Sequence, residues 1–372
     1  MTTIRETSLK MVTPMINSVA LLASCGDYVQ VAREKGLLTA IAQRAAERAA
    51  TVPILVFDLS IIAAAIATFL VLRQFTTRLW LRAIVMVLGV FLFELFTSPM
   101  WHNEHLGRFA YVYCDVSWIL TLGWTTLILG VVIFVDRRFS QWSEAGRFVA
   151  YTGILLVLVP IAEIVVVALG IRKYAAEVLD TVSGTAVLGV PLEILYYVPV
   201  FTALVIAFYK YWNFVIDNTA LVPVKKRKWL RAVVLAFIGV FLFELLVEPV
   251  VRNDKFPEWS YIYRDISVLY TGLRVLLIAI GAIVVDRFMI GKSLPLRLGA
   301  GVMLISALAL PFESWFLANG YRVYGSSAVM NYSGFKTPLT GLPVEIVFAI
   351  PCYLLLIVCF IRYWEIVLDN RL

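Results

Sequence analysis

The sequence predicts an all-α integral membrane protein with nine transmembrane helices, arranged as one helix followed by two parallel four-helix repeats. The first reason is composition: 61% of the residues are hydrophobic and 15% are charged, whereas a soluble domain is roughly 45–50% apolar and about 25% charged. The second reason is a series of apolar runs long enough to span a bilayer, and the third is an internal repeat.

An apolar run of about 20 residues is long enough to cross a membrane as a helix. Nine such runs are present, at about 54–73, 82–101, 115–135, 148–170, 190–212, 230–250, 265–285, 297–318 and 341–363. Short polar links separate them, so we expect little room for strands. Residues 1–53 form a predicted N-terminal peripheral segment with a short amphipathic helix at 38–50, and a further membrane-associated helix within 1–53 is left open.

The repeat is visible in the residues themselves. Gly89–Leu95 (GVFLFEL) returns as Gly239–Leu245 (GVFLFEL), and the match continues to Asn218 and Asn370. We therefore predict a first transmembrane helix at 54–79, repeat 1 at 80–218, a basic cytoplasmic linker at 219–229 and repeat 2 at 230–372. Because each repeat contains an even number of spans, the two repeats run in the same direction, related by an axis along the membrane normal.

Lysine and arginine in the short links predict the orientation, because positive loops stay in the cytoplasm. Basic residues occupy alternate links, at 73–82, 137–138, 225–228 and 287–297, all on one side of a nine-span chain. We therefore expect a bacterial-type plasma membrane protein with its C-terminus in the cytoplasm and its N-terminus outside.

Both repeats keep carboxylates within or beside apolar spans, where ionisable groups are costly and commonly functional. The candidate catalytic residues are Glu94, Asp115, Glu163 and Glu193 in repeat 1 and Glu244, Asp265, Glu313 and Glu345 in repeat 2. The predicted topology brings each set of four to one depth near the outer face. The structural alternatives are helix capping for the acids at helix starts and pairing with Arg172 or Arg322 for the mid-helix acids.

Aromatic and basic residues follow these acids in the predicted external links. The candidate substrate-binding residues are Tyr111, Tyr113, Tyr174, Tyr261, Tyr263, Tyr324, Arg172 and Arg322. A carboxylic acid in apolar surroundings can donate a proton, and aromatic faces stabilise a positive charge by about 0.5–2 kcal/mol per contact. The set therefore fits proton donation to an apolar substrate or the passage of a cation or proton.

No metal and no cofactor are predicted. The only histidines are His102 and His105, and Arg252 and Lys255 replace them in repeat 2. Phosphate-binding and dinucleotide-binding glycine motifs are absent from the sequence. The four cysteines form no CxxC and do not recur between the repeats, so we expect neither a structural disulfide nor a cysteine-bound metal.

Two short segments carry a resemblance to a known family. Gly189–Tyr196 (GVPLEILY) and Gly341–Phe348 (GLPVEIVF) resemble the Pro-x-Glu-Glu helix of the small integral-membrane lycopene cyclases. The resemblance covers about 148–212 and 297–364 and carries over Glu193 and Glu345, while Ile194 and Ile346 stand where the family has its second acid. It implies cofactor-independent cyclisation of a carotenoid by protonation of a double bond, as in related membrane terpene cyclases.

Three functions remain open from the sequence. The leading hypothesis is a membrane isoprenoid cyclase or isomerase that protonates a polyene. The alternatives are a cation- or proton-coupled transporter or channel built from two parallel repeats, and a non-catalytic scaffold subunit that binds lipid or pigment. The expected partners are a lipid-soluble isoprenoid or other apolar small molecule and membrane lipids, with no nucleic acid; formation of a homo-oligomer is left open.

Overall fold

The computed structural model describes residues 36–181, 185–217, 228–331 and 335–369. Within these residues nine helices are long and apolar enough to cross a membrane. They are α4 (Val52–Leu72), α5 (Leu79–Thr97), α6 (Trp118–Arg138), α7 (Glu144–Ala168), α9 (Ile194–Ile216), α10 (Trp229–Val247), α11 (Val268–Phe288), α12 (Leu294–Ala318) and α14 (Val344–Leu368). The predicted all-α membrane fold is confirmed, with each span a few residues from its expected position.

Among the described residues three shorter α-helices accompany these spans: α3 (Leu37–Glu47), α8 (Ala176–Thr181) and α13 (Ser326–Asn331). Helix α3 confirms the predicted helix at 38–50. Most of the predicted N-terminal segment, including any further helix there, and most of the predicted linker at 219–229 lie outside the described residues.

Short strands occur in the links of the described residues, and all of them except β5 and β6 have a counterpart in the other half. They are β1 (Trp101–Asn103), β2 (Tyr111–Tyr113), β3 (Val116–Ser117), β4 (Arg172–Tyr174), β5 (Ala186–Val187), β6 (Val190–Pro191), β7 (Val251–Asn253), β8 (Tyr261–Tyr263), β9 (Ile266–Ser267) and β10 (Arg322–Tyr324). The expectation of little room for strands is confirmed, because each of these strands is only two or three residues long. Their positions were not predicted, since strands this short show no alternating pattern.

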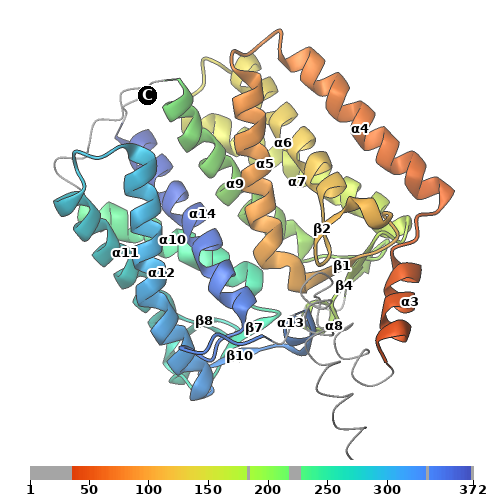
Figure 1. Cartoon of the computed structure of the whole chain (residues 1–372). Coiled ribbons are helices and arrows are strands. Elements are labelled where there is room, and N and C mark those ends of the chain that lie inside the picture. Colours follow the sequence, from red (N-terminus) through yellow and green to blue (C-terminus); the bar gives the residue numbers. More distant parts are fainter. Residues whose placement is uncertain (1–35, 182–184, 218–227, 332–334, 370–372) are drawn as a thin grey trace, which may run out of the picture.

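These strands gather at one end of the helices, which we call the strand end (Figure 1). β1 pairs antiparallel with β4 and places Asn103 opposite Arg172. β7 pairs with β10 in the same way and places Asn253 opposite Arg322. Each pairing therefore sets an asparagine beside the arginine that follows the fourth span.

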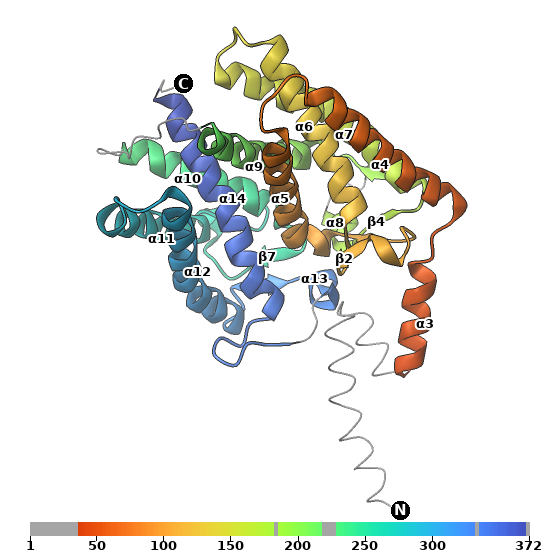
Figure 2. The same cartoon turned by 45° about the horizontal axis from the view of Figure 1, so that its top comes forward.

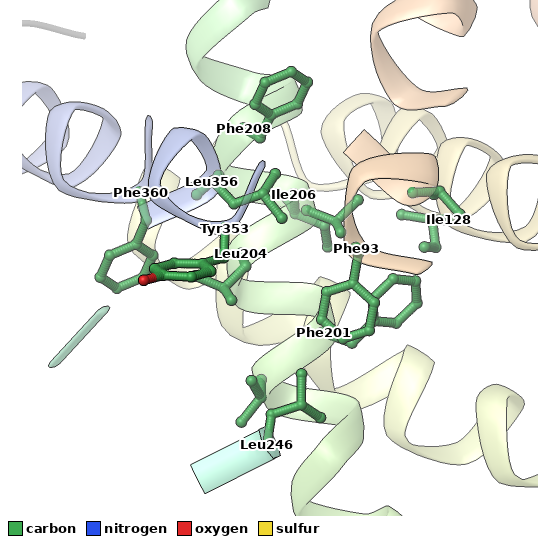
Figure 3. Packing of buried hydrophobic residues seen from close by; sticks show 14 of the residues in the cluster. Phe93, Ile128, Phe201, Leu204, Ile206, Phe208, Leu246, Tyr353, Leu356 and Phe360 are labelled. Atoms are coloured by element: carbon green, nitrogen blue, oxygen red, sulfur yellow. The ribbon is translucent and has the colours of Figure 1, made fainter. Parts of the chain in front are cut away.

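The core lies where the two halves meet. α9 packs against α14, α5 packs against both, and α10 packs against α14 (Figures 1 and 2). Figure 3 shows Phe93 of α5, Leu204 and Ile206 of α9, and Leu356 and Phe360 of α14 within this core, all of them buried. By contrast, α4 packs on α6 and exposes much of its apolar surface, as expected of a lipid-facing helix.

Two recurring glycines allow the central helices to approach closely. A Cβ atom on Gly89 would lie 2.9 Å from the Phe208 ring, and one on Gly239 would lie 3.1 Å from Ile357 and 3.2 Å from Phe360. Small residues at such contacts let membrane helices pack tightly in the absence of a hydrophobic driving force.

One expectation about the cysteines was wrong. Cys114, in the turn between β2 and β3, is disulfide-bonded, whereas Cys352 and Cys359 are free thiols. The repeat gave no sign of this bond because Arg264 occupies the matching position in repeat 2.

A hydrogen-bonded carboxylate joins the two halves at the strand end. Glu177 of α8 accepts a 2.7 Å hydrogen bond from the Ser327 backbone N–H and another from the Ser326 hydroxyl, at the start of α13. Burial raises the pKa of Glu177, but the hydrogen bonds from Ser326 and Ser327 outweigh that effect and lower the pKa to about 2. The bonds thus favour the ionised form.

We expect Glu177→Ala to lower the free energy of unfolding at pH 7 by about 1–2 kcal/mol, because hydrogen bonds to a charged group are lost. The folded pKa of about 2 lies below the ordinary value of 4.5. The stabilisation is therefore complete above about pH 4.5 and disappears as the pH falls towards 2. Thermal unfolding in detergent across this range measures it, with Asp180→Asn on the same helix as the control. Equal stability of wild type and Glu177→Ala at pH 7 would show that the hydrogen bonds of Glu177 do not stabilise the fold.

Candidate functional site

Four charged side chains from repeat 2 form a buried cluster near the strand end. Arg274 Nη1 lies 2.7 Å from Glu244 Oε1, and Arg322 Nη1 lies 3.0 Å from Glu244 Oε2. Glu313 lies 3.5 Å from each guanidinium. All four residues are buried. Two carboxylates and two guanidiniums make the cluster neutral, which offsets the cost of placing charges among apolar helices.

Neighbouring side chains fix the geometry of this cluster. Tyr324 donates a 2.6 Å hydrogen bond to Glu313, and Tyr270 donates another. Asn253 accepts a 2.7 Å hydrogen bond from Arg322. The Arg274 guanidinium also lies over the rings of Phe243, Tyr270 and Tyr353, at 5.3, 4.6 and 5.1 Å from their centroids. These contacts hold Arg274 by both charge and cation–π attraction.

Repeat 1 has the same plan with one cation fewer. Arg172 pairs with Glu163 and donates a 3.0 Å hydrogen bond to Asn103. Tyr174 donates a 3.1 Å hydrogen bond to Glu163. Glu94 accepts a hydrogen bond from Thr121. Trp124 stands at the position that Arg274 occupies in repeat 2.

A cavity of about 700 Å³ lies beside the repeat 2 cluster, between the two halves. Its walls come from the end of α5 in repeat 1 and from α10, α14 and residues 335–338 in repeat 2. Most of the lining is apolar or aromatic, including Leu95, Phe96, Phe243, Val247, Phe335, Phe348, Ala349, Ile350 and Tyr353. Its charged groups are Arg274, Glu313, Arg322, Lys336 and Glu345. This volume and lining suit an apolar small molecule.

Glu345 is a candidate acid that lines this cavity. It lies in the first turn of α14, directly after Pro343 and Val344, and lines the cavity together with Tyr113 of β2. Burial raises the pKa of Tyr113 to about 12. A carboxyl group of repeat 2 and a phenol of repeat 1 therefore face the same space.

The other predicted site residues lie elsewhere. Glu193 is buried immediately before α9 and is not among the residues that line the cavity. Asp115 shares a 3.0 Å hydrogen bond with His102, and Asp265 lies in the matching hairpin turn. Tyr111 and Tyr261 donate hydrogen bonds to the backbone carbonyls of the strand asparagines, and Tyr263 stacks on Arg264. The two aspartates and these three tyrosines thus belong to the hairpins. None of the five is among the described residues that line the cavity.

Several members of the cluster were not predicted from the sequence. Asn103 and Asn253 recur between the repeats, so their recurrence within the chain was a usable signal. Arg274 also had a signal, because a lone arginine inside an apolar run is as costly as a carboxylate. Tyr270 and Tyr353 had none, since a tyrosine on an apolar helix is ordinary and repeat 1 has Leu120 and Phe201 instead.

Comparison with known protein families, with characterised proteins and with solved structures finds no match for this chain. The functional interpretation therefore rests on the cavity, on the cluster beside it and on the short Pro-x-Glu resemblance.

Proposed function

We propose that this chain is a membrane isoprenoid cyclase or isomerase that binds a lipid-soluble polyene in the cavity between the repeats. The observation that carries the proposal is the position of Glu345, which lines an apolar and aromatic cavity large enough for part of a polyene chain. It is also the acid of the Pro343-Val344-Glu345 segment that resembles the lycopene cyclase helix.

We assign the proton-donor role to Glu345, which lines the cavity, because Glu244 and Glu313 are ion-paired within the cluster. Glu244 and Glu313 each face two guanidiniums within 3.5 Å. Their role in the proposal is to fix Arg274, Arg322 and the phenols of Tyr324 and Tyr270 at the polar end of the cavity.

The proposed reaction needs no cofactor because it is an isomerisation. The Glu345 carboxylic acid adds its proton to a terminal double bond and leaves a tertiary carbocation. A neighbouring double bond of the same chain attacks that carbon and closes a ring. Loss of a proton from the new cation to the Glu345 carboxylate restores both the alkene and the acid. The rings of Phe243, Phe348 and Tyr353 stabilise the passing positive charge.

The membrane setting agrees with this chemistry. The chain is an integral membrane protein, so an apolar substrate reaches the cavity from the lipid. We further propose the bacterial-type plasma membrane with a cytoplasmic C-terminus, on the basis of the basic links. The strand end and the cavity then lie towards the outer leaflet.

A transporter is less well supported. A second buried polar network lies further along α9, where Lys210 Nζ is 2.8 Å from Glu144 and 3.0 Å from Asp136. Between this network and Phe201, which lies near the repeat 1 acids, α9 presents Leu204, Val205 and Ile206, each fully buried. Along the described residues of α9 these apolar side chains separate the two polar regions, whereas a transport path needs polar groups through the membrane.

Expression in a host that accumulates lycopene and other linear isoprenoids tests the proposal. We expect new cyclic products in extracted membranes from cells with the wild-type chain and their loss with Ala349→Trp, which fills the cavity wall without removing an acid. A melting curve of purified Ala349→Trp checks that the variant folds. Unchanged pigments in cells with the wild-type chain would contradict a carotenoid substrate. An unchanged profile of all isoprenoids would contradict the proposed enzymatic activity.

A further inference from the structure

We propose that repeat 1 binds a small monovalent cation of the ammonium type beside Glu94, in the position that the Arg274 guanidinium takes in repeat 2. This site is separate from the large cavity and does not depend on the proposed cyclase activity.

The two repeats provide the comparison. Glu94, Glu163 and Arg172 correspond to Glu244, Glu313 and Arg322. In repeat 2 the second positive charge comes from Arg274, 2.7 Å from Glu244 and 3.5 Å from Glu313. In repeat 1 an uncharged indole, Trp124, takes that position. Two carboxylates then face one guanidinium, and the cluster lacks one positive charge.

The space for that charge is present. A cavity of about 50 Å³ is lined by Glu94, Glu163, Arg172, Trp101, Trp124 and Phe201, among others. A cavity that holds a single water needs a volume of roughly 10–15 Å³. The cavity therefore has room for an ammonium-sized cation together with water.

Glu94 supplies an unpaired oxygen to this space. The residue is 6% exposed, and its Oε2 accepts a hydrogen bond from Thr121. In the part of the chain that the structure describes, the Glu94 hydrogen bond is made by Oε2, Oε1 forms no ion pair, and Glu94 lines the cavity. An ionised carboxylate in an apolar span is costly without a positive partner, and the described residues place no cation within ion-pair distance of that oxygen.

The rings around the cavity select the kind of cation. Phe93 and Phe201 have centroids 4.5 Å apart and lie side by side in Figure 3. They match Phe243 and Tyr353, which flank the Arg274 guanidinium in repeat 2. Aromatic faces favour weakly hydrated cations such as ammonium, and the missing charge is a single one. A monovalent, weakly hydrated cation fits both conditions better than a divalent ion that demands many oxygen ligands.

Thermal unfolding of the purified full-length chain in detergent tests the site without any polyene. We expect ammonium chloride to raise the melting temperature saturably by at least about 3 °C relative to choline chloride at equal ionic strength. Glu94→Gln removes the excess charge but keeps a partner for Thr121, so its melting temperature should not respond to ammonium. Glu193→Gln, the matched control, should respond like wild type. Trp124→Arg should supply the charge from the protein and also abolish the response.

Three results would overturn the site. The first is an equal effect of ammonium and choline, and the second is a full ammonium response in Glu94→Gln. The third is a wild-type stability that depends on pH alone and not on ammonium, because a proton on Glu94 would then supply the charge. These melting measurements do not depend on the cyclase proposal. If the expression assay gave no cyclic products, the expected response to ammonium would be the same.

Discussion

Replacing Arg274 with methionine is expected to lower the free energy of unfolding by about 3–5 kcal/mol, the cost of breaking a buried ion pair from one side. Arg274 is 7% exposed and contacts both carboxylates of the repeat 2 cluster. Without it, Glu244 and Glu313 share the single guanidinium of Arg322. Methionine has a similar length, so the lost volume is small and the lost charge dominates.

Unfolding of the purified protein in detergent measures this effect. The double variant Glu244→Gln/Arg274→Met should recover part of the loss, because one carboxylate and one guanidinium then remain. Arg287→Met, an exposed residue after the same apolar run, should change the stability by less than about 0.5 kcal/mol. A single Arg274→Met variant as stable as Arg287→Met would show that the cluster contributes nothing to folding.

Replacing Glu345 with glutamine is expected to reduce cyclic product formation by about 10²–10⁴-fold, the usual contribution of a positioned general acid. Glutamine keeps the shape of the side chain at the cavity wall but has no acidic proton. The substrate still binds, so the rate of ring formation falls while the affinity for the polyene changes little.

The repeat supplies a matched control for this variant. Glu193→Gln alters the corresponding residue of repeat 1, which is not among the cavity-lining residues, and should retain most of the activity. Product formation by extracted membranes, normalised to the amount of folded protein, compares the two. Full activity in Glu345→Gln with loss in Glu193→Gln would place the reaction in repeat 1.

Much of the fold was predictable because the controlling features are local. Span length depends on consecutive apolar residues and bilayer thickness, and all nine spans were expected near their observed positions. The pairing of β1 with β4 was not expected, because it joins residues such as Asn103 and Arg172 that lie far apart in the sequence.

The candidate site was predictable only in part. Glu94, Glu163, Glu244 and Glu313 recur in apolar spans, which identified them as candidates, and each is buried and hydrogen-bonded or ion-paired. Arg172 and Arg322 were predicted both as binding residues and as partners of these acids, and they pair with Glu163 and with both Glu244 and Glu313. Recurrence could not identify Arg274, because this arginine is present in one repeat only.

The sequence by itself determined that the chain is an all-α membrane protein, that its two halves share a pattern of residues, and that this pattern contains costly carboxylates. The tertiary structure decided that Glu345 lines the cavity while Glu193 lies buried outside its lining, and that Arg274 completes one cluster while Trp124 leaves the other short of a cation. The reason is physical. Hydropathy and recurrence act along the chain, whereas cavities and charge neutralisation depend on which distant side chains the packed helices bring together.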